Sequence, residues 1–138
     1  MEIKDLIQET IDNLSNSYAP YSSFKVSALL ETEEGKFYPG VNIENASYSP
    51  TNCAERTAFF TAVGQGERKF KRIFIVGGKD GIVEDYTAPC GVCRQVMMEF
   101  CDPDSFEIIL AKSPEDYRVY KLKDLLPLGF GPSDLCEV

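Results

Sequence analysis

The sequence of 138 residues contains no histidine. Histidine is the commonest general base near neutral pH and the commonest nitrogen ligand of protein-bound metal ions. Its absence excludes catalytic and metal sites that depend on an imidazole. Hydrolytic chemistry in this chain would therefore have to use carboxylates and a metal ion held by other side chains.

The chain also lacks a long apolar run and an excess of positive charge. No stretch approaches the ~20 apolar residues that span a bilayer, and the opening residues Met1–Asp5 do not resemble a secretion signal. The formal net charge is −8, with 14 basic and 22 acidic residues, which disfavours binding to nucleic-acid phosphates. We therefore expect a cytoplasmic protein with no membrane and no nucleic-acid polymer as partner.

Hydrophobic periodicity and turn residues predict helices and strands within one domain over residues 1–138. Thr51 or Asn52 is the expected N-cap of the second helix, and Gly77 with Gly78 is expected to end the third strand. Together, the predicted elements make an α/β protein with a five-stranded sheet. Its elements are a helix over 2–17, a hairpin of strands 26–31 and 36–43, a helix over 53–62, a strand over 72–76, a helix over 91–100, and strands over 106–111 and 117–121.

Cysteine is the residue through which this chain can bind a metal. The five cysteines are an odd number, which suits the reducing cytosol better than a disulfide framework. Three of them, Cys53, Cys90 and Cys93, stand in the motifs Cys-Ala-Glu and Pro-Cys-Gly-Val-Cys. Three thiolates can hold one zinc ion and leave its fourth tetrahedral position open, as in catalytic sites. Cys101 and Cys136 are expected to be ordinary thiols.

Two residues next to Cys53 have expected roles beside the metal. Glu55 can act as the acid and base that moves protons during hydrolysis. Three thiolates exceed the charge of one zinc ion by a single unit, and Arg56 can offset this by donating hydrogen bonds to the sulfurs. Arg94 is a further, weaker candidate for the same role.

Cys90-x-x-Cys93 considered alone leaves other interpretations open. Such a pair also occurs in redox proteins and as half of a structural zinc site. Cys-Ala-Glu upstream, without a fourth cysteine at similar spacing, favours the catalytic site. A non-catalytic zinc-binding module with a closed site remains an alternative that a fourth protein ligand would support.

Five segments together resemble the small, homotetrameric, zinc-dependent cytidine deaminases. Cys-Ala-Glu with Pro-Cys-x-x-Cys is the signature of the wider deaminase class, and Asn42-Ile-Glu44-Asn is the more specific element. The resemblance implies a three-layer α-β-α sandwich around a five-stranded mixed sheet, and one zinc ion per subunit of a homotetramer. The matching segments are 19–26 (APYSSFKV), 41–48 (VNIENASY), 53–58 (CAERTA), 89–95 (PCGVCRQ) and 125–127 (LLP).

The resemblance also implies substrate contacts. Asn42 and Glu44 would bind the sugar hydroxyls, and Phe24 would stack on the pyrimidine. The remaining implied positions are Ala54 and Tyr48 at the substrate, Tyr21 and Tyr48 at subunit contacts, and Phe130 reaching across to a neighbouring subunit. The chain departs from the family pattern at Ser27, where glycine is usual, and we expect no change in chemistry from it.

The resulting expectation is a hydrolase of pyrimidine salvage that converts cytidine and 2′-deoxycytidine into uridine and 2′-deoxyuridine with release of ammonia. Its substrate partner is a small nucleoside. The alternative enzyme is a deaminase of a modified cytosine nucleoside, such as blasticidin S, because that class keeps both cysteine motifs. Asn42-Ile-Glu44-Asn and Phe24 favour the ordinary nucleoside.

Overall fold

A computed structural model describes residues 1–136 and shows five strands in one sheet, in the order β2-β1-β3-β4-β5. Only the β3–β4 pair is parallel, so the sheet is mixed, as predicted. The elements are α1 (Ile3–Asp12), a 3-10 turn (Asn13–Asn16), β1 (Phe24–Thr32), β2 (Phe37–Val41), α2 (Ala54–Gly64), β3 (Phe70–Lys79), α3 (Gly91–Phe100), β4 (Glu107–Ser113), β5 (Asp116–Lys121), α4 (Leu122–Leu125) and a second 3-10 turn (Pro132–Asp134).

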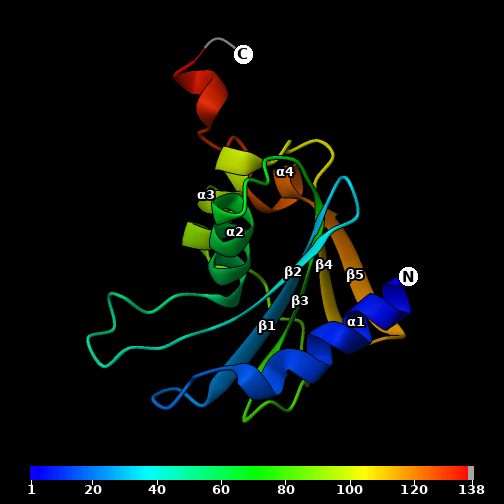
Figure 1. The fold of residues 1–138 in the computed structure, drawn as a ribbon, viewed down its shortest axis with the longest axis vertical. Coiled ribbons are helices and arrows are strands. Elements are labelled where there is room, and N and C mark those ends of the chain that lie inside the picture. The colour runs from blue at the N-terminus through cyan, green and yellow to red at the C-terminus, as the bar shows by residue number, and fades with distance from the viewer. Residues whose placement is uncertain (137–138) are drawn as a thin grey trace.

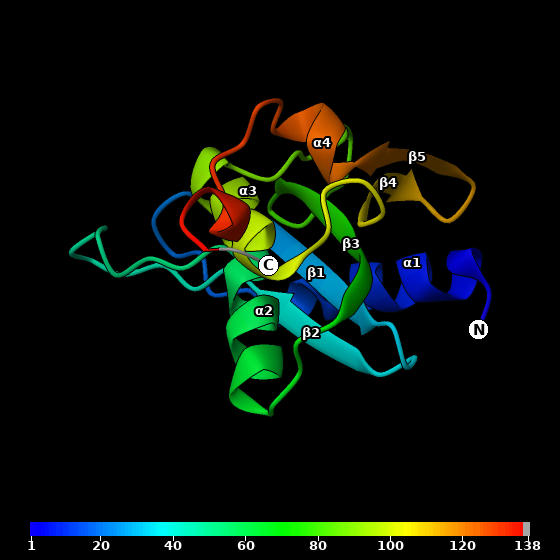
Figure 2. The same cartoon turned by 90° about the horizontal axis from the view of Figure 1, so that it is seen from above.

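Helices cover both faces of this sheet. Helix α1 lies on one face, and α2 with α3 lies on the other (Figures 1 and 2). The strand sequences explain this, because apolar side chains alternate between two buried faces instead of between core and solvent. In β3, Ile73 and Ile75 pack beneath α2 and α3, whereas Phe74 and Val76 pack against α1. The predicted three-layer α-β-α sandwich is therefore confirmed.

Helix α2 lies close to the sheet because its inward stripe is made of small residues. Ala54, Ala58 and Ala62 recur every four positions and are fully buried. Gly40 of β2 completes the approach, since a Cβ there would lie 2.4 Å from the carbonyl oxygen of Ala54. This contact fixes the first turn of α2, where Glu55 lies.

Strand β3 continues through the two glycines that were expected to end it. Gly77 and Gly78 pair with Val26 and Lys25 of β1, and the strand ends at Lys79. The chain after β3 returns over the strand, so that a Cβ on Gly78 would lie 1.9 Å from the carbonyl oxygen of Ile82. Glycine is therefore needed here because another segment of the chain passes close to the strand, and not because the strand turns.

Two helix boundaries also differ from the predictions. The first helix ends at Asp12, because the following Asn and Ser residues form local side-chain hydrogen bonds, such as Asn16 to Asn13, in a 3-10 turn. The second helix has Cys53 as its N-cap instead of Thr51 or Asn52. Asn52 is held in extended backbone by two hydrogen bonds with Ile43, so the helix starts only after Cys53.

None of the helices in residues 1–136 is both long and apolar enough to cross a membrane.

Candidate metal centre and adjoining pocket

The structure brings the sulfurs of Cys53, Cys90 and Cys93 to one point. Cys53 Sγ lies 3.7 Å from Cys90 Sγ, Cys90 Sγ lies 3.3 Å from Cys93 Sγ, and all three lie within 4.8 Å of one another. Zinc–sulfur bonds of about 2.3 Å in a tetrahedral site place two sulfurs about 3.8 Å apart. The three thiols therefore fit a single zinc ion. Within residues 1–136, no other group of three or more such side chains is clustered in this way.

The local fold explains why these thiols converge. Cys53 and Cys90 are the N-caps of α2 and α3, and both have extended backbone just outside their helices. The sulfur of Cys90 accepts a hydrogen bond from the backbone N–H of Cys93, which is the usual capping pattern. Two helix N-termini thus point at the cluster, and their partial positive charges favour thiolates.

The electrostatics of the cluster favour a bound cation. Hydrogen bonds from Cys93 and Arg56 lower the pKa of the Cys53 thiol to about 5. The pKa of the Cys93 thiol is raised, because its S–H donates a hydrogen bond to Cys53 and because it lies buried beside other anionic groups. One thiolate, that of Cys53, is therefore stable in the protein alone, and Cys93 needs a positive ion beside it to ionise as well.

Arg56 and Arg94 were both expected to donate hydrogen bonds to the thiolates, and in the structure only Arg56 does so. Arg56 Nη2 donates to Cys53 Sγ over 3.2 Å. Arg94 instead donates from Nε to the carbonyl of Pro89 and from Nη1 to the carbonyl of Leu125, over 2.8 and 2.7 Å. The expected role of Arg94 at the sulfurs is therefore replaced by a role at the backbone.

Glu55 lies in the first turn of α2, and the residue is only 4% exposed. Because Cys53 stands outside the helix, the two side chains can face the same cavity although they are two positions apart. Burial raises the pKa of the Glu55 carboxyl to about 7. A carboxyl of this kind can accept and release a proton near neutral pH.

A cavity of about 230 Å³ opens beside the cysteine cluster. It brings together most of the residues that the sequence assigned to catalysis and substrate, including Phe24, whose ring is 40% exposed and free to face a ligand. Five lining residues were not predicted to lie at the site: Ser22, Val26, Thr51, Asn52 and Thr87. The predicted lining residues are Phe24, Asn42, Glu44, Cys53, Ala54 and Glu55.

Asn42 and Glu44 are held rigidly by hydrogen bonds and keep limited capacity for a ligand. Asn42 Oδ1 accepts from Ser17 Oγ and from the N–H of Val26, and Nδ2 donates to the carbonyl of Phe24. An amide has two N–H donors, so one donor remains.

The carboxylate of Glu44 accepts from the N–H groups of Tyr21 and Ser22 and from the hydroxyl of Ser22. These bonds, with the Ser22 hydroxyl contributing most, hold the pKa of Glu44 below its ordinary value. A carboxylate has about four acceptor positions, so one remains. One free donor at Asn42 and one free acceptor at Glu44 suit the hydroxyl groups of a sugar.

Two predicted substrate residues lie outside this cavity in the single chain. Tyr48 lines an adjoining cavity of about 370 Å³ with Tyr21, Ser22, Glu44 and Thr51, and its ring meets that of Tyr21 edge to face. Phe130 is 58% exposed, and its carbonyl accepts a hydrogen bond from Gln95. This exposure does not fit a ring that caps the core of its own subunit.

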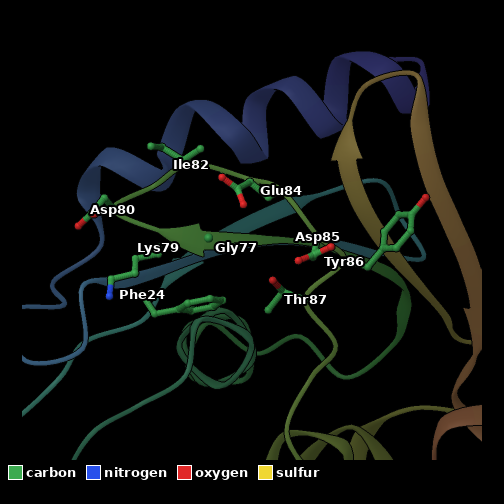
Figure 3. Close-up of a pocket in the computed structure, with 10 residues that line it drawn as sticks. Phe24, Gly77, Lys79, Asp80, Ile82, Glu84, Asp85, Tyr86 and Thr87 are labelled. Atoms are coloured by element: carbon green, nitrogen blue, oxygen red, sulfur yellow. The ribbon is translucent and has the colours of Figure 1, made fainter.

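A larger cavity of about 510 Å³ shares Phe24 and Thr87 with the cavity at the cysteines (Figure 3). Its remaining wall carries Asp80, Glu84 and Asp85, and Figure 3 shows Phe24 and Thr87 facing each other near Gly77. It contains no cysteine and neither Asn42 nor Glu44. The smaller cavity is therefore the one in which a substrate would meet the metal.

The chain is similar to proteins of a known family. Residues 1–106 match the family described as the cytidine and deoxycytidylate deaminase zinc-binding region. Cytidine deaminase of Sporosarcina psychrophila is 44% identical over 135 residues, which cover 98% of this chain and 96% of that protein. Cytidine deaminase of Halalkalibacterium halodurans is 41% identical and covers 98% of each chain.

Solved structures agree. The crystal structure of cytidine deaminase from Burkholderia pseudomallei superposes with a TM-score of 0.85 at 45% identity, and covers 94% of this chain and 100% of that one. The enzyme from Mycobacterium tuberculosis gives a TM-score of 0.77 at 32% identity, with 95% and 98% covered.

Proposed function

Because this chain belongs to the family of cytidine and deoxycytidylate deaminases that bind zinc, we propose that it deaminates cytidine and 2′-deoxycytidine. The reaction adds water to the pyrimidine, breaks the bond from C4 to the exocyclic nitrogen, and yields uridine or 2′-deoxyuridine with ammonia. The observation that carries this proposal is that a cluster of three thiols adjoins one cavity, which is also lined by the buried carboxyl of Glu55 and by the polar side chains of Asn42 and Glu44.

Cys53, Cys90 and Cys93 hold the zinc ion in this proposal, and Arg56 compensates part of their charge through its bond to Cys53. When bound there, zinc supplies Lewis acidity that makes water a nucleophile at neutral pH. The absence of a fourth thiol in the described cluster leaves room for that water and argues against a closed structural site.

Glu55 moves the protons. It accepts one proton from the attacking water and delivers it to N3 of the base, and it then carries the second proton of that water from the oxygen on C4 to the leaving amine. Its burial keeps bulk water away from these transfers. Its raised pKa means that neither the charged nor the neutral form is strongly preferred near neutral pH.

The rest of the cavity positions the nucleoside. The exposed ring of Phe24 offers a flat apolar face for the pyrimidine. The free N–H of Asn42 and the free lone pair of Glu44 bind the ribose hydroxyls, and Ser17 and Ser22 hold those two side chains in place. Ala54, at the N-terminus of α2, lines the cavity beside Glu55.

The same proposal includes a homotetramer. Tyr21, Tyr48 and Phe130 are all more than half exposed in the single chain, at 52%, 72% and 58%. Exposed aromatic side chains beside an open pocket are typical of interaction surfaces. Neighbouring subunits would cover the nucleoside, with Phe130 of one chain reaching the pocket of another, and would exclude water from the reaction.

The proposed setting is pyrimidine salvage in the cytoplasm. All five cysteines are free thiols in the structure, and a reducing compartment keeps the metal-binding sulfurs reduced. A deaminase of free nucleosides also needs no basic surface, which agrees with the net charge of −8.

An assay on the purified protein tests the proposal. Cytidine, 2′-deoxycytidine and blasticidin S are supplied separately, and loss of substrate absorbance is measured together with ammonia release and zinc content. We expect zinc-dependent turnover of the two ordinary nucleosides with much higher kcat/KM than for the antibiotic. Turnover of blasticidin S alone, or normal zinc content with no turnover at all, would contradict it.

A further inference from the structure

Cys90 differs from the other two cysteines of the cluster in how it is held. Cys93 lies inside α3 and is buried, whereas Cys90 is exposed and stands at the end of residues 80–90, which form neither helix nor strand. Its sulfur accepts a capping bond from the N–H of Cys93, and its direction otherwise depends on groups that fix its backbone. The structure supplies those groups on one residue, Arg94.

Arg94 holds the backbone on both sides of Cys90. Its Nε donates to the carbonyl of Pro89 over 2.8 Å, and this bond depends on the arginine side chain. Its backbone N–H donates to the carbonyl of Cys90 over 3.0 Å, which is the regular helical bond that any residue at this position would make. These carbonyls belong to the two peptide groups that flank the Cα of Cys90. Fixing both peptide planes fixes the φ and ψ angles of Cys90, and so the direction of its side chain.

The same guanidinium is itself anchored outside the loop. Its Nη1 donates to the carbonyl of Leu125, at the end of α4, over 2.7 Å. Arginine can do this because its donors form a rigid planar fork that stays charged, whereas lysine presents one flexible ammonium group. The positive charge near the N-terminus of α3 opposes the helix dipole, so the carbonyl bonds account for its place there.

We propose that Arg94 is a positioning residue that orients Cys90 toward the metal. This inference rests on the proposed zinc site and adds to it a residue that touches neither metal nor substrate. Groups that orient metal ligands typically contribute about 10- to 100-fold to metal affinity. Losing Arg94 should therefore loosen zinc without changing the other two sulfurs.

The test compares zinc release from Arg94→Gln, Arg94→Lys and two matched controls. Arg68→Gln removes an arginine that also donates to two backbone carbonyls, those of Val63 and Glu67, but at the far end of α2. Gln95→Ala removes a bond from α3 to the carbonyl of Phe130 and leaves Pro89 untouched. Each zinc-loaded protein is mixed with a coloured chelator, and the rate of zinc transfer is measured.

We expect Arg94→Gln to release zinc about 10- to 100-fold faster than the wild type, with Arg94→Lys intermediate and both controls close to the wild type. Cobalt-loaded Arg94→Gln should also show a weaker thiolate-to-metal charge-transfer band, because fewer sulfurs remain bound. If Arg94→Gln does not fold, the intermediate behaviour of Arg94→Lys is the deciding result.

The outcomes separate this inference from the proposed function. Equal release rates for the wild type and the Arg94 variants, or equal acceleration by a control, would overturn the role of Arg94 and leave the zinc enzyme intact. A wild-type protein that binds no zinc would overturn both.

Discussion

Arg56 Nη2 donates a hydrogen bond to the sulfur of Cys53 over 3.2 Å, across the first turn of α2. This bond withdraws electron density from a sulfur that would otherwise place all its charge on the metal. Three thiolates carry one more charge than zinc can neutralise, so the guanidinium bears directly on how acidic a water at the metal can become.

Replacement of Arg56 tests this relationship. Arg56→Gln should keep zinc and lower kcat by roughly 10- to 100-fold, because the site becomes more negative. Steady-state kinetics with metal analysis of the same sample measures both effects. Arg68→Gln, which removes an arginine far from the cysteines, serves as the control. Wild-type kcat in Arg56→Gln would contradict the charge argument.

Removal of zinc should lower the melting temperature as well as abolish turnover. A metal that binds only the folded state stabilises it by roughly 4 kcal/mol at a thousandfold excess over its dissociation constant. The measurement is thermal unfolding under reducing conditions after dialysis against a chelator. Added zinc should restore both properties, whereas magnesium should restore neither, because it prefers oxygen ligands. If the melting temperature of the zinc-free protein were the same as that of the zinc-loaded protein, the result would contradict the idea that one zinc site serves both stability and turnover.

Ser27 offers a test of the core that is independent of catalysis. It is fully buried in β1, and among the described residues its hydroxyl has no hydrogen-bond partner. A buried unpaired hydroxyl costs about 1–3 kcal/mol, so Ser27→Ala should raise the free energy of unfolding by about 1 kcal/mol. Urea denaturation measures this value.

The control for Ser27 is Thr10, a buried residue of α1 that lines a small cavity together with Ser27. Its hydroxyl donates to the carbonyl of Leu6, so Thr10→Val removes a satisfied group and should give no gain in stability. A loss of stability in Ser27→Ala would show that its hydroxyl is bonded in solution.

The proposed tetramer predicts a molecular mass of about four times 15.4 kDa by light scattering. Phe130→Ala should raise KM for cytidine and keep zinc, because the ring would cover the pocket of a neighbouring chain. Leu135→Ala, which changes another exposed apolar residue of the C-terminal segment, is the matched control. A fully active monomer would contradict this part of the proposal.

The sequence predicted the layers of the fold because their signal is local. Ile73 to Val76 and Ile108 to Ala111 are apolar at every position, which is the pattern of strands covered on both faces. The extent of β3 was not predictable in this way. Gly77 and Gly78 resemble a turn when considered alone, and only the return of residues 82–87 over the strand explains them.

In the candidate site, too, some residues could be identified from the sequence and others only from the fold. Spacing and chemistry identified Cys53, Cys90, Cys93 and Glu55, and their predicted roles stay predictions until tested. Ser17 and Ser22 hold Asn42 and Glu44 by hydrogen bonds, although the partners are 25 and 22 positions apart in the sequence. Arg94 reaches Leu125 across 31 positions. No pattern in a single sequence signals such partners, although Ser22 lies within a segment that matches the family.

The most direct test of the account is the Glu55→Gln variant, with zinc content and turnover measured on the same preparation. Metal binding needs the three thiolates, and proton transfer needs the carboxylate. We predict that the variant keeps one zinc ion per chain, as in the wild type, and loses about 100-fold or more in kcat on cytidine. Loss of zinc, or turnover at the wild-type rate with zinc retained, would contradict the assignment of Glu55 as the proton carrier beside a three-cysteine zinc site.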